Sequence, residues 1–149
     1  MTILINKGTK LLIQGITGRE GRLHTKLMLN NGSKIIAGVT PGREGKTIED
    51  KPVYNSIKTA IRKHSEINAS ILFVPAAHAA EAVYEAIDED IGLIIVITEQ
   101  IPIHETVKFI EYAKRKNTRI IGPNCPGVIS PGESMAGIMP SSSRKEILE

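Results

Sequence analysis

The stretch Gly15-Ile16-Thr17-Gly18-Arg19-Glu20-Gly21 constrains the fold of this chain more than any other. An apolar run, Leu11 to Ile13, leads into it, and a helix-like segment, Arg22 to Asn30, follows. Glycines let a backbone turn tightly and approach a ligand closely. The free N–H groups and the positive dipole end of the next helix then attract an anion. The order of strand, glycine turn and helix therefore predicts a place that binds a phosphate group.

The glycine spacing alone does not identify a ligand. It reads G-x-x-G-x-x-G here, whereas dinucleotide enzymes carry G-x-G-x-x-G after their first strand. A tight turn between a strand and a helix, with no ligand, would produce the same glycines. Both interpretations stay open at this point, although the coincidence of strand, glycines and helix favours a ligand site.

Short apolar runs alternate with helix-like segments along the chain. Strands are expected at Lys10–Gln14, Lys34–Val39, Ala69–Val74, Leu93–Ile97 and Arg119–Ile121, with a short extended piece at Lys51–Tyr54. Helices are expected at Arg22–Asn30, Ser56–His64, Ala77–Asp88 and His104–Lys116, and residues 128–149 are expected to be loop-like, with room for a short terminal helix. This alternation predicts an α/β fold with a mostly parallel sheet and right-handed crossovers.

The core of this fold must be aliphatic, because aromatic residues make up 3% of the chain and Trp is absent. Such a composition suits a parallel sheet whose strands are buried on both faces. In the last expected helix, Ile103, Val107 and Ile110 share one face at helical spacing. A length of 149 residues suits one domain with a real core.

Charge and cysteine content exclude several classes of function. The net charge of +3 fits a small anionic ligand better than a nucleic acid. One cysteine, Cys125, excludes an internal disulfide and a multi-cysteine metal site. No apolar run is long enough for a membrane span, and residues 1–10 lack a signal peptide. We therefore expect a cytoplasmic or mitochondrial-matrix protein, with the cytoplasm preferred.

Parallel sheets bind ligands at the carboxyl ends of their strands. NAD enzymes hold the ribose there with an acid at the end of the second strand, but here that strand runs into Thr40-Pro41-Gly42-Arg43. Arg43 suits a ribose phosphate instead, as in NADP or coenzyme A (CoA). Arg43 and Lys46 could equally be solvated loop cations. Glu99, after a strongly aliphatic strand, is either a site residue or a cap for the next segment.

The remaining polar candidates suggest no catalytic or metal centre. The four histidines show no metal-ligand spacing. His24 and His104 lie on helices without a visible carboxylate partner, and His64 lies on an apolar helix face where packing is expected. His78 is placed to face the crevice, although a structural role is expected. Cys125 stands between prolines with no base beside it in sequence, so we do not interpret it as a nucleophile.

Six stretches, taken in order, resemble one known family. They are Gln14–Gly21, Gly38–Gly42, Phe73–Ala76, Ile97–Glu99, Ile121–Gly127 and Met135–Pro140. Together they are similar to the alpha subunit of succinate–CoA ligase (succinyl-CoA synthetase), and the resemblance covers about residues 3–140.

The resemblance implies that residues 1–149 form a CoA-binding, Rossmann-like domain with a doubly wound sheet of at least the five predicted strands. The residues that it implies for CoA binding are Thr17, Gly18, Arg19, Glu20, Arg43, Ile97, Thr98 and Glu99. The family usually has lysine at position 43, and arginine keeps the charge with a different geometry.

The resemblance also implies a beta subunit that supplies the magnesium and nucleoside triphosphate sites. The complete enzyme would form succinyl-CoA from succinate, CoA and ATP or GTP through a phosphohistidine. The family's phosphorylated histidine lies in a second domain, and Ser141–Glu149 does not resemble the family's continuation. We therefore expect no catalytic residue in this chain and CoA binding without turnover. The alternative is a stand-alone CoA or NAD(P) binding or sensor module.

Overall fold

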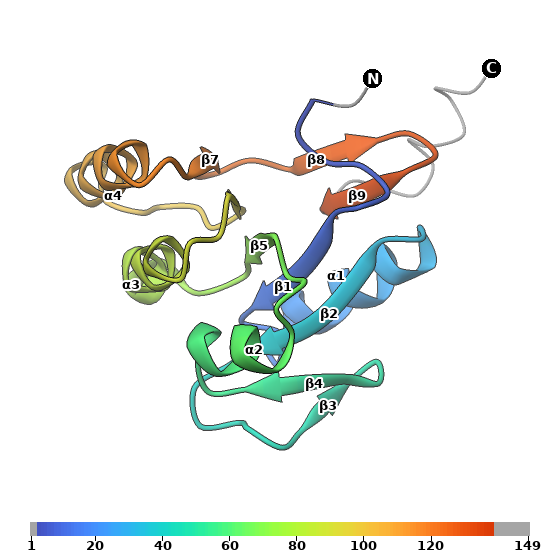
Figure 1. Ribbon diagram of the computed structural model, residues 1–149. Helices are drawn as coiled ribbons and strands as arrows, with labels where there is room; N and C mark the ends of the chain where they lie inside the picture. Colours follow the sequence, from blue (N-terminus) through green and yellow to red (C-terminus); the bar gives the residue numbers. More distant parts are fainter. Residues whose placement is uncertain (1–2, 139–149) are drawn as a thin grey trace.

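The computed structural model describes residues 3–138, which form a seven-stranded sheet with helices on both faces and a separate hairpin (Figure 1). The strands of the sheet are β1 (Lys10–Gln14), β2 (Lys34–Val39), β3 (Thr47–Ile48), β4 (Lys51–Tyr54), β5 (Ala69–Leu72), β6 (Leu93–Val96) and β7 (Arg119–Ile121). The helices are α1 (Arg19–Asn30), α2 (Ile57–Lys63), α3 (Ala76–Asp88) and α4 (Ile103–Arg115).

The strand order β3-β4-β2-β1-β5-β6-β7 makes the sheet doubly wound. The chain runs outward from β1 through β2 and β4, and then returns past β1 to build β5, β6 and β7 on the other side. All neighbours are parallel except β3 and β4. The predicted α/β, Rossmann-like fold is confirmed. Its topological switch point lies between β1 and β5, where such sheets form a crevice.

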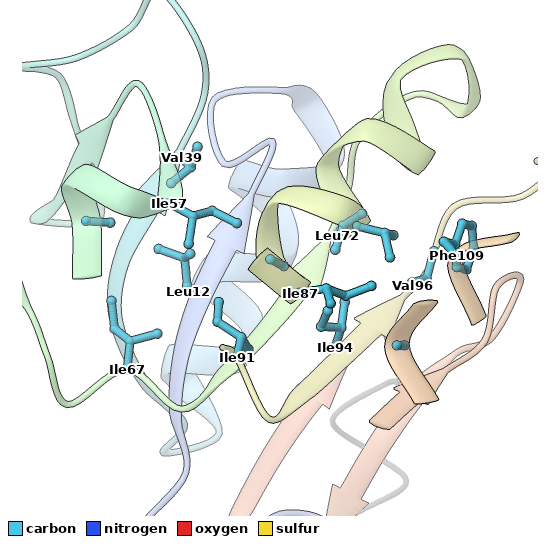
Figure 2. Close-up of a cluster of buried hydrophobic side chains, with 14 of the residues drawn as sticks. Leu12, Val39, Ile57, Ile67, Leu72, Ile87, Ile91, Ile94, Val96 and Phe109 are labelled. Carbon is cyan, nitrogen blue, oxygen red and sulfur yellow. The ribbon is translucent and has the colours of Figure 1, made fainter. Parts of the chain in front are cut away.

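Alternating side chains on the strands build two apolar layers. On β1, Leu12 belongs to the apolar cluster that includes residues of α2, α3 and α4, whereas Leu11 and Ile13 belong to the cluster that includes Met28 of α1. On β6, Ile94 likewise belongs to the first layer and Ile95 to the second. Figure 2 shows the first layer, in which aliphatic side chains of the sheet meet those of the three helices. Burial on both faces explains why these strands are nearly continuous apolar runs.

Helix α1 begins at Arg19, three residues earlier than the predicted start at Arg22. Gly18 is its N-cap and has an extended conformation, with φ −70° and ψ 166°. Arg19 and Glu20 therefore lie in the first helical turn and not in the preceding loop. This shift places the helix N-terminus directly at the end of the glycine stretch.

The expectation that residues 128–149 are loop-like is wrong for the described part. Gly127–Ser130 (β8) and Ser134–Gly137 (β9) form an antiparallel hairpin. Ser33 fixes it to the end of α1, because its Oγ donates to Met135 O at 2.6 Å and accepts from Met135 N at 3.1 Å. The expected terminal helix and the family-like Met139–Pro140 lie outside the described residues. Strand β3 also forms where no strand was predicted, between the expected strands at Lys34–Val39 and Lys51–Tyr54.

The apolar face predicted for α4 packs only in part, because Ile110 lies against the core while Ile103 and Val107 are exposed. Ile103 is 83% exposed and Val107 is 55% exposed, while Phe109 and Ala113 are buried. Both sets of residues have helical spacing, so periodicity does not distinguish them. Contact with α3 and the sheet selects the stripe that carries the large aromatic ring. Among residues 3–138, no helix combines the length and apolar character that a membrane span requires.

Candidate functional site

Hydrogen bonds between loops join the carboxyl ends of the central strands into one crevice. The Thr17 N–H donates to Thr40 Oγ1 at 3.4 Å, which connects the loops after β1 and β2. The Thr98 Oγ1–H donates to Val74 O at 2.6 Å, which connects the loops after β6 and β5. The Asn124 N–H donates to Thr98 O at 3.0 Å and adds the loop after β7. Loops that are far apart in sequence therefore surround one site.

Each glycine of the opening stretch meets a different steric demand. Gly15 has a φ of +79°, which a residue with a side chain rarely adopts. A Cβ at Gly21 would overlap the carbonyl oxygen of Gly15, so this glycine lets α1 pack closely against the loop. At Gly18 the nearest atom to an added Cβ is 3.5 Å away, so the space beside the N-cap is open.

The N-terminus of α1 is left available to a ligand. The first-turn N–H groups of an α-helix have no acceptor within the helix. No side chain caps α1, because its N-cap is a glycine. Anions bind such N-termini through the N–H groups and the helix dipole. The predicted residues Thr17, Gly18, Arg19 and Glu20 all lie at this end of the helix.

Two cations stand on the loop after β2. The Arg43 N–H donates to Thr40 O at 3.1 Å, and the Lys46 N–H donates to Arg43 O at 3.3 Å, so two consecutive turns shape the loop. The Gly42 N–H donates to Asn55 Oδ1 at 2.8 Å and anchors the first turn. Arg43 and Lys46 are exposed, and neither charged head group has a partner among residues 3–138.

A pocket of about 510 Å³ opens between the glycine loop, the loops after β2 and β5, and α3. Its lining consists of Gln14, Gly15, Val39, Thr40, Pro41, Val74, Pro75, His78, Glu81, Ala82 and Glu85. The walls are mainly apolar, and α3 adds two carboxylates. Neither acid was predicted as a site residue. Their signal was the spacing of His78, Glu81 and Glu85 at i, i+3 and i+7 on a helix that follows a crevice strand.

Gln14 forms the buried polar link behind this pocket. Its Nε2 donates to Ala82 O at 2.9 Å, and its Oε1 accepts from the Ser70 hydroxyl at 2.8 Å. The amide therefore connects β1 with α3 and β5 at once. Because a buried amide without partners would be costly, these bonds fix the distance between the sheet and α3 at the pocket.

Glu85 is a desolvated carboxylate that caps α2. Its Oε1 accepts from the Ile57 N–H at 2.7 Å. Burial raises the pKa of Glu85 above its usual value of 4.5, the Ile57 hydrogen bond partly opposes this, and the charges of Glu89 and Glu81 raise the pKa further. A raised carboxyl pKa means that the folded chain keeps this proton to higher pH than the unfolded chain does. Its contribution to stability therefore decreases as pH rises above about 4.5.

We expect Glu85→Gln to abolish this pH dependence, because the amide oxygen still accepts from Ile57 N–H and the charge is gone. Urea denaturation should show the variant gaining on the wild type between pH 4.5 and pH 7. The gain should be at most about 1 kcal/mol, because water screens a half-exposed group. Glu111→Gln, which removes an exposed carboxylate 3.0 Å from Lys114 Nζ, is the control. A wild type that gains on the variant with rising pH would contradict the expectation.

The expectation that His24 lacks a carboxylate partner is wrong. Its Nε2 lies 3.0 Å from Glu20 Oε2, and its ring stacks on Phe73 with centroids 5.4 Å apart. The pair became possible because α1 starts early enough to place both residues on one helix at i and i+4. His64 also has a polar partner, since its Nε2 lies 2.9 Å from the Tyr54 hydroxyl oxygen.

Cys125 is held as a thiol. Burial raises the pKa of the Cys125 thiol, although a backbone hydrogen bond from Gly127 opposes the shift. The Sγ lies 3.4 Å from Val96 O, to which the thiol donates. The thiolate is therefore disfavoured at this position. Among residues 3–138, no group of three or more His, Cys, Asp or Glu side chains could hold a metal ion.

Ile97, Thr98 and Glu99 follow β6 at the same end of the sheet. Ile97 packs against the apolar layer on the α1 side, and Thr98 makes the loop contacts described above. Glu99 is exposed and has no partner among the described residues. The alternative role for Glu99, capping the next helix, is not observed. The N-cap residue of α4 is Pro102, and no side chain makes a capping hydrogen bond there.

The sequence of residues 6–100 matches the family described as CoA binding domain. The chain belongs to the CoA binding domain family. Its matched segment runs from before β1 to just after β6 and contains every predicted site residue.

Curated relatives of this CoA binding domain confirm the resemblance found in its sequence. It is 51% identical over 140 residues to succinate–CoA ligase [ADP-forming] subunit alpha 2 of Archaeoglobus fulgidus. The matched residues cover 94% of this chain and 48% of the relative. It is 47% identical over 142 residues to the corresponding alpha subunit of Aquifex aeolicus, covering 94% of this chain and 46% of the relative. The chain spans about half the length of these relatives.

Solved structures share the fold at low identity. An ATP citrate lyase from Methanothrix soehngenii, in complex with citrate and coenzyme A, superposes with a TM-score of 0.77 and 24% identity over 91% of this chain and 24% of that chain. A D-galactose-1-dehydrogenase from Rhizobium etli superposes with a TM-score of 0.64 and 19% identity over 80% of this chain and 38% of that chain. Because a dehydrogenase shares this architecture, the fold alone does not select the ligand.

Proposed function

We propose that this CoA binding domain holds CoA in the crevice and forms the CoA-binding part of a succinate–CoA ligase alpha subunit. The observation that carries the proposal is the uncapped N-terminus of α1, which opens beside the 510 Å³ pocket and the exposed Arg43. The free helix N-terminus, the apolar pocket and the Arg43 cation suit the pyrophosphate, the adenine and the 3′-phosphate of CoA. The family and the relatives support the same ligand.

The parts of CoA are assigned to the chain by charge and polarity. The first-turn N–H groups of α1, with Gly18 and Thr17, receive the pyrophosphate. The apolar pocket takes the adenine, and Glu81 offers a carboxylate to its amino group or to ribose hydroxyls. Arg43 binds the 3′-phosphate. Ile97, Thr98 and Glu99 lie where the remaining pantetheine arm leaves the crevice.

The proposed enzyme needs more than this domain. We propose a beta subunit as the partner that supplies nucleotide and magnesium sites, because the relatives are named as alpha subunits. Residues 1–149 then act as the CoA-binding unit of the pair. The complete enzyme would convert succinate, CoA and ATP or GTP to succinyl-CoA, ADP or GDP, and phosphate. Support for this assembly comes from sequence identity, whereas the support for CoA binding also includes the geometry of the crevice.

Calorimetric titration with CoA, dephospho-CoA, NAD and NADP tests the ligand. CoA should bind most tightly, and dephospho-CoA about 10- to 150-fold more weakly, because it lacks the phosphate that Arg43 would bind. NAD should bind more weakly than CoA, since no acid follows β2. NAD or NADP binding more tightly than CoA would contradict the proposal and favour a stand-alone dinucleotide sensor.

The chain by itself should not accept a phosphoryl group from a nucleoside triphosphate. It contains no G-x-x-x-x-G-K-[ST] loop, and residues 3–138 hold no metal-binding cluster. Phosphoryl transfer depends on positioning and charge neutralisation, which those features supply. Incubation with labelled ATP or GTP and magnesium should leave the chain unlabelled. Acid-labile, alkali-stable label on a histidine would contradict this expectation.

A further inference from the structure

His24 is fixed by two contacts that the proposed CoA site does not explain. Its Nε2 lies 3.0 Å from Glu20 Oε2 one turn earlier on α1. Its ring stacks on Phe73 at the end of β5, with the two planes 11° apart. The His24 side chain is 12% exposed, whereas that of Glu20 is 64% exposed. A constrained ring therefore holds a carboxylate that would otherwise be free to move.

The chemistry of the two groups shows which side chain donates the hydrogen bond. A carboxylate only accepts, so the His24 nitrogen that faces Glu20 carries the hydrogen. The other nitrogen, Nδ1, is buried and has no partner among the described residues. Among residues 3–138, the ring therefore makes its polar contact to Glu20 and stacks on Phe73. Together they select one position for the Glu20 carboxylate.

The position of Glu20 matters because it is the second residue of α1. Carboxylates in a first helical turn are attracted to the free N–H groups and the positive dipole end. A Glu20 carboxylate there would occupy the place that a phosphate needs and would repel it. In the structure the carboxylate points to His24 instead, and no side chain caps the helix.

We propose that His24 is a positioning residue that holds the Glu20 carboxylate away from the first-turn N–H groups of α1 and so keeps them open to phosphate oxygens. The inference rests on the proposed function in that the phosphate is taken to be the pyrophosphate of CoA. Without His24, Glu20 becomes an intramolecular competitor of the ligand. The role is indirect, because His24 acts only through Glu20.

A double-mutant cycle on the 149-residue chain tests this role. His24→Phe keeps an aromatic ring on Phe73 and removes the contact to Glu20, so it should weaken CoA binding about two- to fivefold, the size of a helix-end charge effect. Glu20→Gln removes the competing charge and sets the reference affinity for the second half of the cycle. His24→Phe should then have no effect in the Glu20→Gln background. An equal loss in both backgrounds would show that His24 supports only the fold and would overturn the proposal.

A second measurement needs no CoA. Without ligand, His24→Phe should move the backbone amide NMR signals of Arg19, Glu20 and Gly21 more when residue 20 is glutamate than when it is glutamine. This double difference cancels the direct effect of changing residue 20. Equal shifts in both backgrounds would overturn the proposal. If CoA fails to bind the wild type while the double difference is seen, the proposed function fails and the role of His24 stands.

Two further variants protect the test. His24→Leu removes the same contact without a ring and serves if His24→Phe does not fold. Glu111→Gln changes the net charge equally on α4, where the carboxylate pairs with Lys114. It should alter neither CoA affinity nor the α1 amide signals, and a matching change in this control would assign the effect of Glu20→Gln to net charge and overturn the proposal.

Discussion

Replacing Gly21 with alanine is expected to destabilise the fold by about 2–3 kcal/mol, the cost of strong overpacking. The added Cβ would overlap the carbonyl oxygen and carbon of Gly15 and the Cα of Ile16. These are backbone atoms, so no side chain can rotate away, and α1 must shift from the sheet. Urea denaturation followed by far-UV circular dichroism measures the loss. The higher helix propensity of alanine offsets only about 1 kcal/mol of a larger steric cost.

Gly18→Ala is the matched control on the same loop. Its φ of −70° suits any residue, and the nearest atom to a Cβ there is 3.5 Å away. We expect its free energy of unfolding to fall by no more than about 1 kcal/mol, the cost of alanine at an N-cap. Equal destabilisation by the two substitutions would contradict the close packing assigned to Gly21.

Arg43→Met should lower the affinity for CoA about 10- to 150-fold, because it removes a charge-assisted hydrogen bond to the 3′-phosphate. The affinity for dephospho-CoA should stay nearly unchanged, since that ligand has no phosphate at this position. Calorimetric titration of the wild type and the variant with both ligands gives the result directly. Arg43 is exposed and makes its loop contacts through the backbone, so the fold should not change.

Lys46→Met, in the adjacent turn of the same loop, is the control for general electrostatic attraction. Its effect on CoA affinity should be smaller, because an unpaired surface cation contributes little. Arg43→Lys keeps the charge and loses the planar fork of the guanidinium, so it should retain part of the discrimination. If Arg43→Met weakens CoA and dephospho-CoA equally, Arg43 does not contact the 3′-phosphate.

The sequence by itself determined the order of the main elements and which loops follow the carboxyl ends of the strands, where parallel sheets bind ligands. Strands β1, β2, β4 and β7 have the predicted bounds, and β5 and β6 end one or two residues early. Strands β3, β8 and β9 were not predicted. The signals of the predicted strands are local, since continuous apolar runs mark strands buried on both faces and glycines mark turns. The position of Arg43 after β2, where no acid stands, had favoured cofactors that carry a ribose phosphate. The family resemblance then indicated CoA among them.

The tertiary structure alone decided which side chains meet in the crevice. Glu81 and Glu85 reach the pocket because Gln14 holds α3 against β1, more than sixty residues away in the chain. Of the two apolar stripes on α4, packing selected that of Phe109 and left Ile103 exposed. Periodicity shows that a face exists, but only the position of neighbouring elements determines which face is buried.

The His24–Glu20 pair shows, within a single helix, the same difference between what the sequence and what packing determined. Both residues were visible in sequence, but their contact depends on where α1 begins. That start follows from the extended conformation of Gly18 and from the close approach of Gly21 to Gly15, a residue that itself lies against the Phe73 backbone after β5. Helix ends respond to such nonlocal contacts, because intrinsic propensity differs by well under 1 kcal/mol between most residues. The sequence therefore defined the loop, and packing decided which of its residues became helical.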